Sequence, residues 1–168
     1  MSTVQVTLRR IGPCAFEATD GNGHYARVDA SPELEAQILE RVPHPEAVPK
    51  VADAGPIPSG DRAGLRPMQL LLVSLAGCAA MDIVLILARQ RQDLRDMVIA
   101  VEGVRVEGTP APFEKITLRF TAHGEVDLGK LQRAVELGVT KYCSVASTLD
   151  PKVNVMWEAT VVPSPNNK

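Results

Sequence analysis

The sequence predicts a single α+β domain of 168 residues, with strands first, a long central helix and then a β-β-α-β half. Two observations support this class. Residues 68–88 form a nearly unbroken apolar run of helical length. On both sides of this run, short segments rich in β-branched and apolar residues are separated by Gly- and Pro-containing turns.

The individual elements follow in chain order. We expect three short strands at 4–10, 14–20 and 24–30, and a short helix at 31–42 with Ser31 as its N-cap. Residues 42–67 contain six prolines and predict a long loop that covers another part of the protein. After the central helix, residues 97–108 and 113–124 predict a strand pair, 127–142 a helix capped by Asp127, 143–150 a short turn or helix, and 152–162 the last strand.

Composition and charge exclude several classes of partner and site. The net charge is −2 and there is no basic run, so we expect no nucleic acid and no membrane partner. The N-terminal residues lack an apolar secretory region, so we expect a cytoplasmic protein with reduced thiols. No Cys or His pair has metal-ligand spacing, so no metal is expected.

The central run is as long as a membrane span, which needs about 20 apolar residues. Gln69, Ser74 and Asp82 interrupt it, and a charged residue at membrane depth is costly. We therefore expect a core helix. Because it is apolar on most sides, one small protomer would cover it poorly, so we also expect an obligate homodimer.

The cysteines Cys14, Cys78 and Cys143 are the candidate reactive groups. Cys78 shares a helical stripe with Asp82, and the neighbouring Gly77 indicates close approach of another segment. Cys143 lies at the predicted start of a short helix, where a thiolate is stabilised. Each thiol also has a simpler interpretation as a small packed hydrophobe, which we favour for Cys14.

Two motifs in these segments resemble a known family. "RPMQLLLVSLAGCAAMDIVLIL" together with "KYCSVASTL" resembles the OsmC/Ohr family of thiol-dependent hydroperoxidases, and looks most like its YhfA-type OsmC-like branch. The matching positions are Pro67, Gly77, Cys78 and the "CSVAS" segment at 143–147. The resemblance covers residues 4–162 as one OsmC-like domain, within which 31–62 looks like an insertion.

The resemblance implies a function and a set of residues. Cys78 would attack the peroxide O–O bond and become a sulfenic acid, Cys143 would resolve it as a disulfide, and an external dithiol reductant would restore both thiols without a cofactor. Members of the family are intertwined homodimers with the site at the subunit interface. Substrates would be small organic hydroperoxides or hydrogen peroxide.

The sequence departs from the family pattern at the groups that activate the thiol. The peroxidases have a Glu after the motif proline, where this chain has Met68 followed by Gln69. We expect Met68, Gln69 and Asp82 to line the pocket. The activating cation is expected to be Arg10 or, as the alternative, Arg66.

Three functional interpretations stay open. The first is the peroxidase, and the second is a catalytically weak OsmC-like dimer that binds a small apolar ligand or senses redox state. The third is a purely structural dimer in which both thiols only pack. The retained pair of cysteines favours the first, whereas the missing Glu favours the second.

Overall fold

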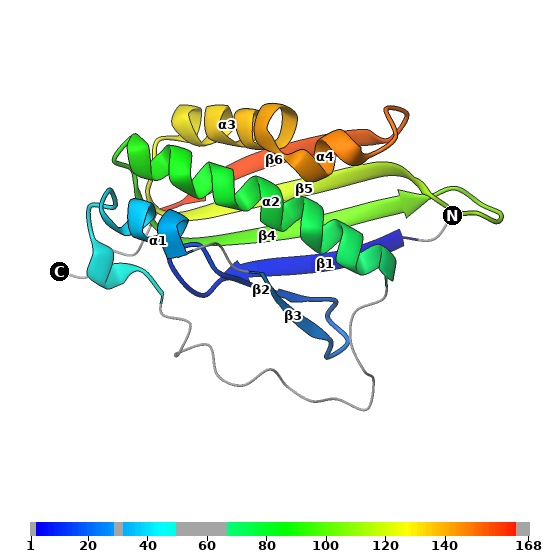
Figure 1. The fold of residues 1–168 in the computed structure, drawn as a ribbon, viewed down its shortest axis with the longest axis horizontal. Helices are drawn as coiled ribbons and strands as arrows, with labels where there is room; N and C mark the ends of the chain where they lie inside the picture. The colour runs from blue at the N-terminus through cyan, green and yellow to red at the C-terminus, as the bar shows by residue number, and fades with distance from the viewer. Residues whose placement is uncertain (1–2, 29–31, 50–66, 164–168) are drawn as a thin grey trace.

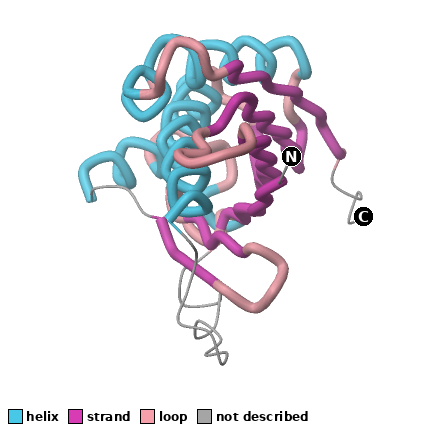
Figure 2. Tube along the Cα trace, turned by 90° about the vertical axis from the view of Figure 1, so that its right-hand side faces the viewer, coloured by secondary structure: helices cyan, strands magenta, loops and turns pink. Residues whose placement is uncertain are grey.

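A computed structural model of the protein describes residues 3–28, 32–49 and 67–163. The predicted α+β class is confirmed: one mixed sheet carries its helices on one face (Figures 1 and 2). The described elements are β1 (Thr3–Arg10), β2 (Phe16–Thr19), β3 (Tyr25–Val28), α1 (Pro32–Leu39), η1 (Pro45–Ala47), α2 (Pro67–Arg89), β4 (Asp93–Arg105), β5 (Phe113–Glu125), α3 (Leu128–Leu137), η3 (Gly138–Tyr142), α4 (Ser144–Thr148) and β6 (Asn154–Val162).

The sheet has six strands in the order β3-β2-β1-β4-β5-β6. β1 and β4 join the N-terminal strands to the C-terminal half through an antiparallel ladder that runs from Thr3↔Val104 to Arg9↔Val98. β6 pairs with β5 in parallel. Because parallel neighbours need a long crossover, the chain between β5 and β6 passes over the sheet as α3, η3 and α4, and this crossover lies beside α2.

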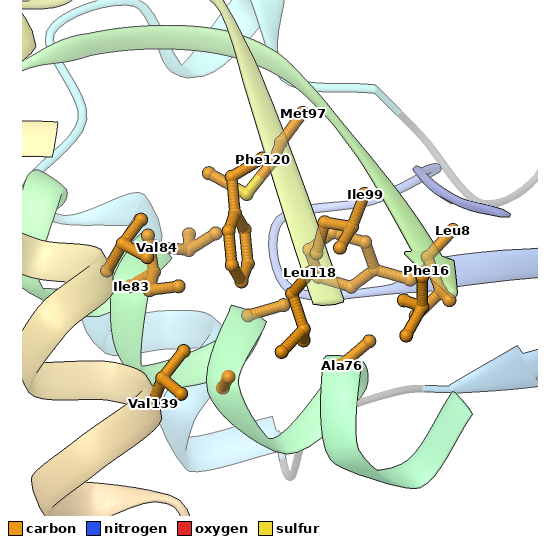
Figure 3. Packing of buried hydrophobic residues seen from close by; sticks show 14 of the residues in the cluster. Leu8, Phe16, Ala76, Ile83, Val84, Met97, Ile99, Leu118, Phe120 and Val139 are labelled. Atoms are coloured by element: carbon orange, nitrogen blue, oxygen red, sulfur yellow. The ribbon is translucent and has the colours of Figure 1, made fainter. Parts of the chain in front are cut away.

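The core lies between α2 and the sheet, as Figure 3 shows. Alternate residues of the two long strands point inward and are buried: Met97, Ile99 and Val101 of β4, and Ile116, Leu118 and Phe120 of β5. They meet a face of α2 that mixes small and large side chains, including Ala76, Ala79, Ala80, Ile83 and Val84. The small residues let the helix pack closely against the strands.

Two glycines allow other elements to touch α2. A Cβ at Gly77 would lie 2.8 Å from Cγ1 of Val28 in β3, so the predicted close approach at this glycine is confirmed. A Cβ at Gly138, the first residue of η3, would lie 2.8 Å from Cγ1 of Ile83 and 3.1 Å from the carbonyl oxygen of Ala79. The second contact brings the crossover down onto α2 just before Cys143.

α2 is also long and apolar enough to cross a membrane by length and composition, and 56% of that stretch is buried inside the protein. Its buried side packs on the sheet and on α3, as expected for a core helix. Its remaining side chains are partly exposed, and Leu70 is 44% exposed. One protomer therefore leaves an apolar stripe of its central helix uncovered.

Several boundaries differ from those predicted. β4 begins at Asp93 instead of residue 97, because Leu94 pairs with Gly124 and is buried in the same core. The helix predicted at 127–142 is α-helical only to Leu137 and then widens into a π-helical turn. Of the expected insertion at 31–62, the structure describes α1 and η1; Ser31, Arg66 and residues 50–66 lie outside the described residues.

Candidate thiol site

Cys143 is positioned by the π-helical turn that ends the crossover helix. The backbone N–H of Cys143 donates to the carbonyl oxygen of Gly138 at 3.1 Å, which is a five-residue span and closes η3. Cys143 then acts as the N-cap of α4, since its Sγ accepts the N–H of Ala146 at 3.3 Å. Single π turns are often found at functional sites, because they shift a side chain out of regular helical register.

The turn places Cys143 against the middle of α2. Cys143 is 4% exposed. Its thiol donates to the carbonyl oxygen of Leu75 at 3.8 Å, and it is also hydrogen-bonded to the side chain of Cys78. Cys78 itself is partly exposed. The structure therefore brings the two predicted thiols together, one buried and one open to the outside.

The environment of Cys143 favours its protonated form. Burial is the main cause that raises the pKa of this thiol to about 11; the N–H of Ala146 opposes the rise, and the neighbouring Cys78 contributes to it. At neutral pH Cys143 is thus a thiol that can donate a hydrogen bond to Cys78. Of the two sulfurs, Cys78 is the one placed to act first as a nucleophile.

Cys78 lies on the uncovered stripe of α2. The side chains that share this stripe by three- and four-residue spacing are all partly or fully exposed: Leu70, Leu71, Ser74, Cys78, Met81, Asp82 and Leu85. Asp82 follows Cys78 by one turn, and burial raises the pKa of its carboxyl. Among the stripe residues near Cys78 the polar groups are the Ser74 hydroxyl and this carboxyl, which opposes a thiolate whenever it is ionised.

Met68 and Gln69 lie apart from Cys78 within one chain. Met68 comes ten residues before Cys78, which is about 15 Å along a helix axis. Gln69 is about two and a half turns away, so it points to the opposite side of α2. There it is buried, and its Nε2 donates to Oδ2 of Asp20 at 3.4 Å.

Gln69 belongs to a buried polar cluster at the start of α2. Asp20 and His24 flank the turn between β2 and β3, and Nδ1 of His24 lies 2.6 Å from Oδ2 of Asp20. Asp20 also accepts the backbone N–H groups of Asn22 and His24. Burial alone would raise the pKa of Asp20, but these hydrogen bonds outweigh it and hold the pKa well below the usual value.

Replacing Asp20 by asparagine should destabilise the protein by roughly 2 kcal/mol at pH 7, because it removes a charged acceptor from several hydrogen bonds. A depressed pKa stabilises the folded state fully above the unfolded value of about 3.9, and this stability is lost as pH falls through the folded pKa. The difference from the wild type should therefore shrink below about pH 4. Urea unfolding at pH 7 and pH 3.5 measures it, with exposed Asp150→Asn as the control; a difference that is independent of pH would contradict the argument.

Arg10 is tied to the turn after β1. Its three nitrogens donate to the carbonyl oxygens of Gly12, Leu94 and Pro13 at 3.0, 3.0 and 2.8 Å. The side chain is fully buried, and burial lowers its pKa to about 10, partly offset by Cys14 and Asp96. Among the described contacts of Arg10 there is none to Cys78, so the expectation that this arginine activates the thiol receives no support from the geometry.

Two features of the site region were not predicted from the sequence. The pairing of Asp20 and His24 had a signal in the "DGNGH" turn, where the two are four residues apart. The π turn had only Gly138 as its signal. Within the described ranges, no three His, Cys, Asp or Glu side chains gather in a way that could hold a metal ion.

Comparisons with known proteins identify the family of the chain. The family described as "OsmC-like protein" matches residues 59–158, a range that contains both Cys78 and Cys143. The chain is similar to Protein YhfA of Escherichia coli, with 39% identity over 105 residues that cover 62% of this chain and 78% of the relative.

Solved structures with the same fold cover almost the whole chain. A hypothetical protein from Aquifex aeolicus is 26% identical, covers 96% of this chain and 99% of its own, and has a TM-score of 0.55. An OsmC-like protein from Mycoplasma pneumoniae is 16% identical, covers 93% and 95%, and has a TM-score of 0.54, a likeness of fold alone.

Proposed function

Since this chain belongs to the family of OsmC-like proteins, we propose that it is a thiol-dependent peroxidase that reduces organic peroxides or hydrogen peroxide through Cys78 and Cys143. One observation carries the proposal: two cysteines 65 positions apart in sequence are hydrogen-bonded to each other where α4 meets α2. Cys78 is open to a substrate, whereas Cys143 is enclosed behind it.

The first step takes place at Cys78. Its thiolate attacks the terminal oxygen of the hydroperoxide, the S–O bond forms as the O–O bond breaks, and an alkoxide leaves and takes a proton from water. The sulfur is oxidised to a sulfenic acid while the peroxide is reduced to an alcohol. The apolar stripe around Cys78, including Leu71 and Leu85, suits the organic part of such a substrate.

The second step belongs to Cys143. Its sulfur attacks the sulfenic sulfur, a disulfide forms, and the oxygen leaves as water. Oxidation of Cys78 removes the neighbouring thiolate that helps to raise the pKa of Cys143, while the N–H of Ala146 still favours the Cys143 thiolate. The resolving thiol therefore becomes easier to ionise after Cys78 has reacted. A dithiol reductant then returns both residues to thiols, so no cofactor is required.

Activation of Cys78 is expected to be weak. An unperturbed thiol is only about 3% thiolate at pH 7, and a nearby cation usually raises this fraction and stabilises the departing alkoxide. In the part of the chain that the structure describes, Arg10 is engaged elsewhere and the ionisable group one turn from Cys78 is Asp82. Small hydroperoxides should therefore react slowly compared with a well-activated peroxidase.

We also propose that the active form is a homodimer. A single chain leaves Leu70, Leu71, Met81 and Leu85 partly exposed beside Cys78 along the central helix. An apolar face of this kind is normally covered by a partner. A second copy placed there would close the pocket around the thiol.

A second candidate function rests on the same weak activation. Without a cation beside Cys78, the dimer would bind a small apolar ligand in its pocket or act as a redox sensor that is oxidised without turnover. Such a protein would form the disulfide once, but would not consume peroxide in excess of its own thiols.

Consumption of cumene hydroperoxide in the presence of dithiothreitol distinguishes these functions. The peroxidase should consume many equivalents of peroxide per chain, and Cys14→Ser should retain the rate because that thiol lies in the core near Arg10. Consumption that stops after one equivalent would support the sensor. If peroxide is consumed no faster than in buffer alone, both thiols serve only as packing residues.

A further inference from the structure

A cavity at the far end of α2 has the features of an anion-binding site. Its volume is about 550 Å³, and six residues line it: Glu40, Arg41, Pro43, Ala88, Arg89 and Arg91. It lies between the segment after α1 and the last turn of α2, and Figure 1 shows α1 beside α2. Arg89 is eleven residues beyond Cys78, about 16 Å along the helix, so this cavity is distinct from the thiol site.

The cavity has an excess of positive charge. Nη1 of Arg41 donates to the carbonyl oxygen of Gln37 at 2.7 Å and lies 3.5 Å from Oε2 of Glu40, which balances one cation. Over the described ranges, neither the Arg89 nor the Arg91 side chain makes an ion pair or hydrogen bond. Two guanidinium groups that share a cavity repel each other, and a bound anion would relieve this repulsion.

The backbone of Arg91 is unusual. Its φ is +54°, and no other non-glycine residue among those described has a positive φ. Arg91 closes the C-terminus of α2: its N–H donates to the carbonyl oxygen of Ala88 at 2.9 Å, and that of Gln92 to the carbonyl oxygen of Leu87 at 3.0 Å. Glycine is the favoured residue in this left-handed position, where an arginine is strained. Such strain is commonly kept where the side chain serves a binding site.

We propose that this cavity binds the phosphate group of a small phosphorylated molecule, held by Arg89 and Arg91. The two unpaired guanidinium groups match the charge of a phosphate monoester, which is about −1.5 to −2 at pH 7. Each guanidinium fork fits phosphate oxygens in a bidentate manner. The cavity has the size of small-molecule sites, so Pro43 and Ala88 provide an apolar wall for the rest of the ligand.

The proposal predicts opposite effects of one substitution on stability and binding. Arg91→Gly should raise the melting temperature by a few degrees, because it relieves the left-handed strain. It should also weaken binding of inorganic phosphate at least tenfold. Arg89→Ala should weaken phosphate binding similarly without the gain in melting temperature, and Arg133→Ala on the exposed surface of α3 should change neither.

Isothermal titration calorimetry of the full chain with inorganic phosphate, at constant ionic strength, measures the affinity. Acetate in place of phosphate tests the ligand class and should bind at least tenfold more weakly. Equal binding of acetate and phosphate, or no phosphate binding by the wild type, would overturn the proposal. So would an Arg91→Gly protein that is more stable and binds phosphate as the wild type does, since Arg91 would then serve only as a helix cap.

Discussion

Replacing Cys78 by serine should lower the rate of peroxide consumption at least a hundredfold, because a hydroxyl of high pKa cannot replace the thiolate as nucleophile. Replacing Cys143 by serine should have a different result. Cys78 would still react, but its sulfenic acid would have no adjacent thiol to resolve it. The Cys143→Ser protein should therefore consume about one equivalent of peroxide in a fast phase. Its rate of peroxide consumption should then fall at least tenfold when the dithiol concentration is limiting.

Trapping with dimedone separates the two roles. The sulfenic acid of Cys78 should be labelled strongly in Cys143→Ser and weakly in the wild type, where the disulfide forms first. Cys14→Ser is the matched control, since it removes a thiol from the core and leaves the pair at α2 intact. Labelling at Cys143 in Cys78→Ser protein, with a retained rate, would reverse the assigned roles.

The second large effect concerns Arg10 and stability. Arg10→Met should lower the free energy of unfolding by about 3 kcal/mol or more, because it leaves three buried carbonyl acceptors without their donor. These bonds hold the turn after β1 against the first residues of β4. Arg9→Met is the matched control: its side chain is 73% exposed, its distance to Asp96 is 3.8 Å, and its loss should cost less than about 1 kcal/mol.

Urea unfolding of both variants measures the stability, and alkylation of Cys78 measures any effect on the thiol. In a Cys14→Ser/Cys143→Ser background, Arg10→Met should leave the pH dependence of alkylation unchanged. A rise in the apparent pKa of Cys78 with no loss of stability would instead make Arg10 the activating cation that the family resemblance suggested.

Most of the fold could be predicted from the sequence, because the periodic patterns that indicate helices and strands are local. Alternation in β5 and the length of the apolar run in α2 depend on near neighbours in the chain, so both were predicted with nearly correct bounds. Asp127 was correctly predicted as the N-cap of α3, since its side chain accepts the N–H of Lys130 at 2.8 Å. The resemblance in "LAGCAA" and "KYCSVAS" supplied the pair of thiols.

The contacts that the sequence did not indicate are those whose partners lie far away in sequence. Arg10 donates to the carbonyl oxygen of Leu94, and Gln69 donates to Asp20 on the side of α2 opposite Cys78. The spacing of residues in the sequence does not indicate the direction in which either side chain points. Gln69 was expected near the thiol because motif alignment gives position along a helix without giving the side it faces. The π turn was not predicted, because Gly138 is equally compatible with a regular helix.

Peptide mapping of the oxidised protein tests the central claim most directly. A mixture of unlabelled and ¹⁵N-labelled chains would be treated with one equivalent of peroxide, alkylated and digested without reduction. We predict a Cys78–Cys143 disulfide whose two peptides always carry the same label, because both thiols belong to one chain and already lie in hydrogen-bonding contact. Two unmodified thiols, a disulfide to Cys14, or peptides of mixed label would contradict it.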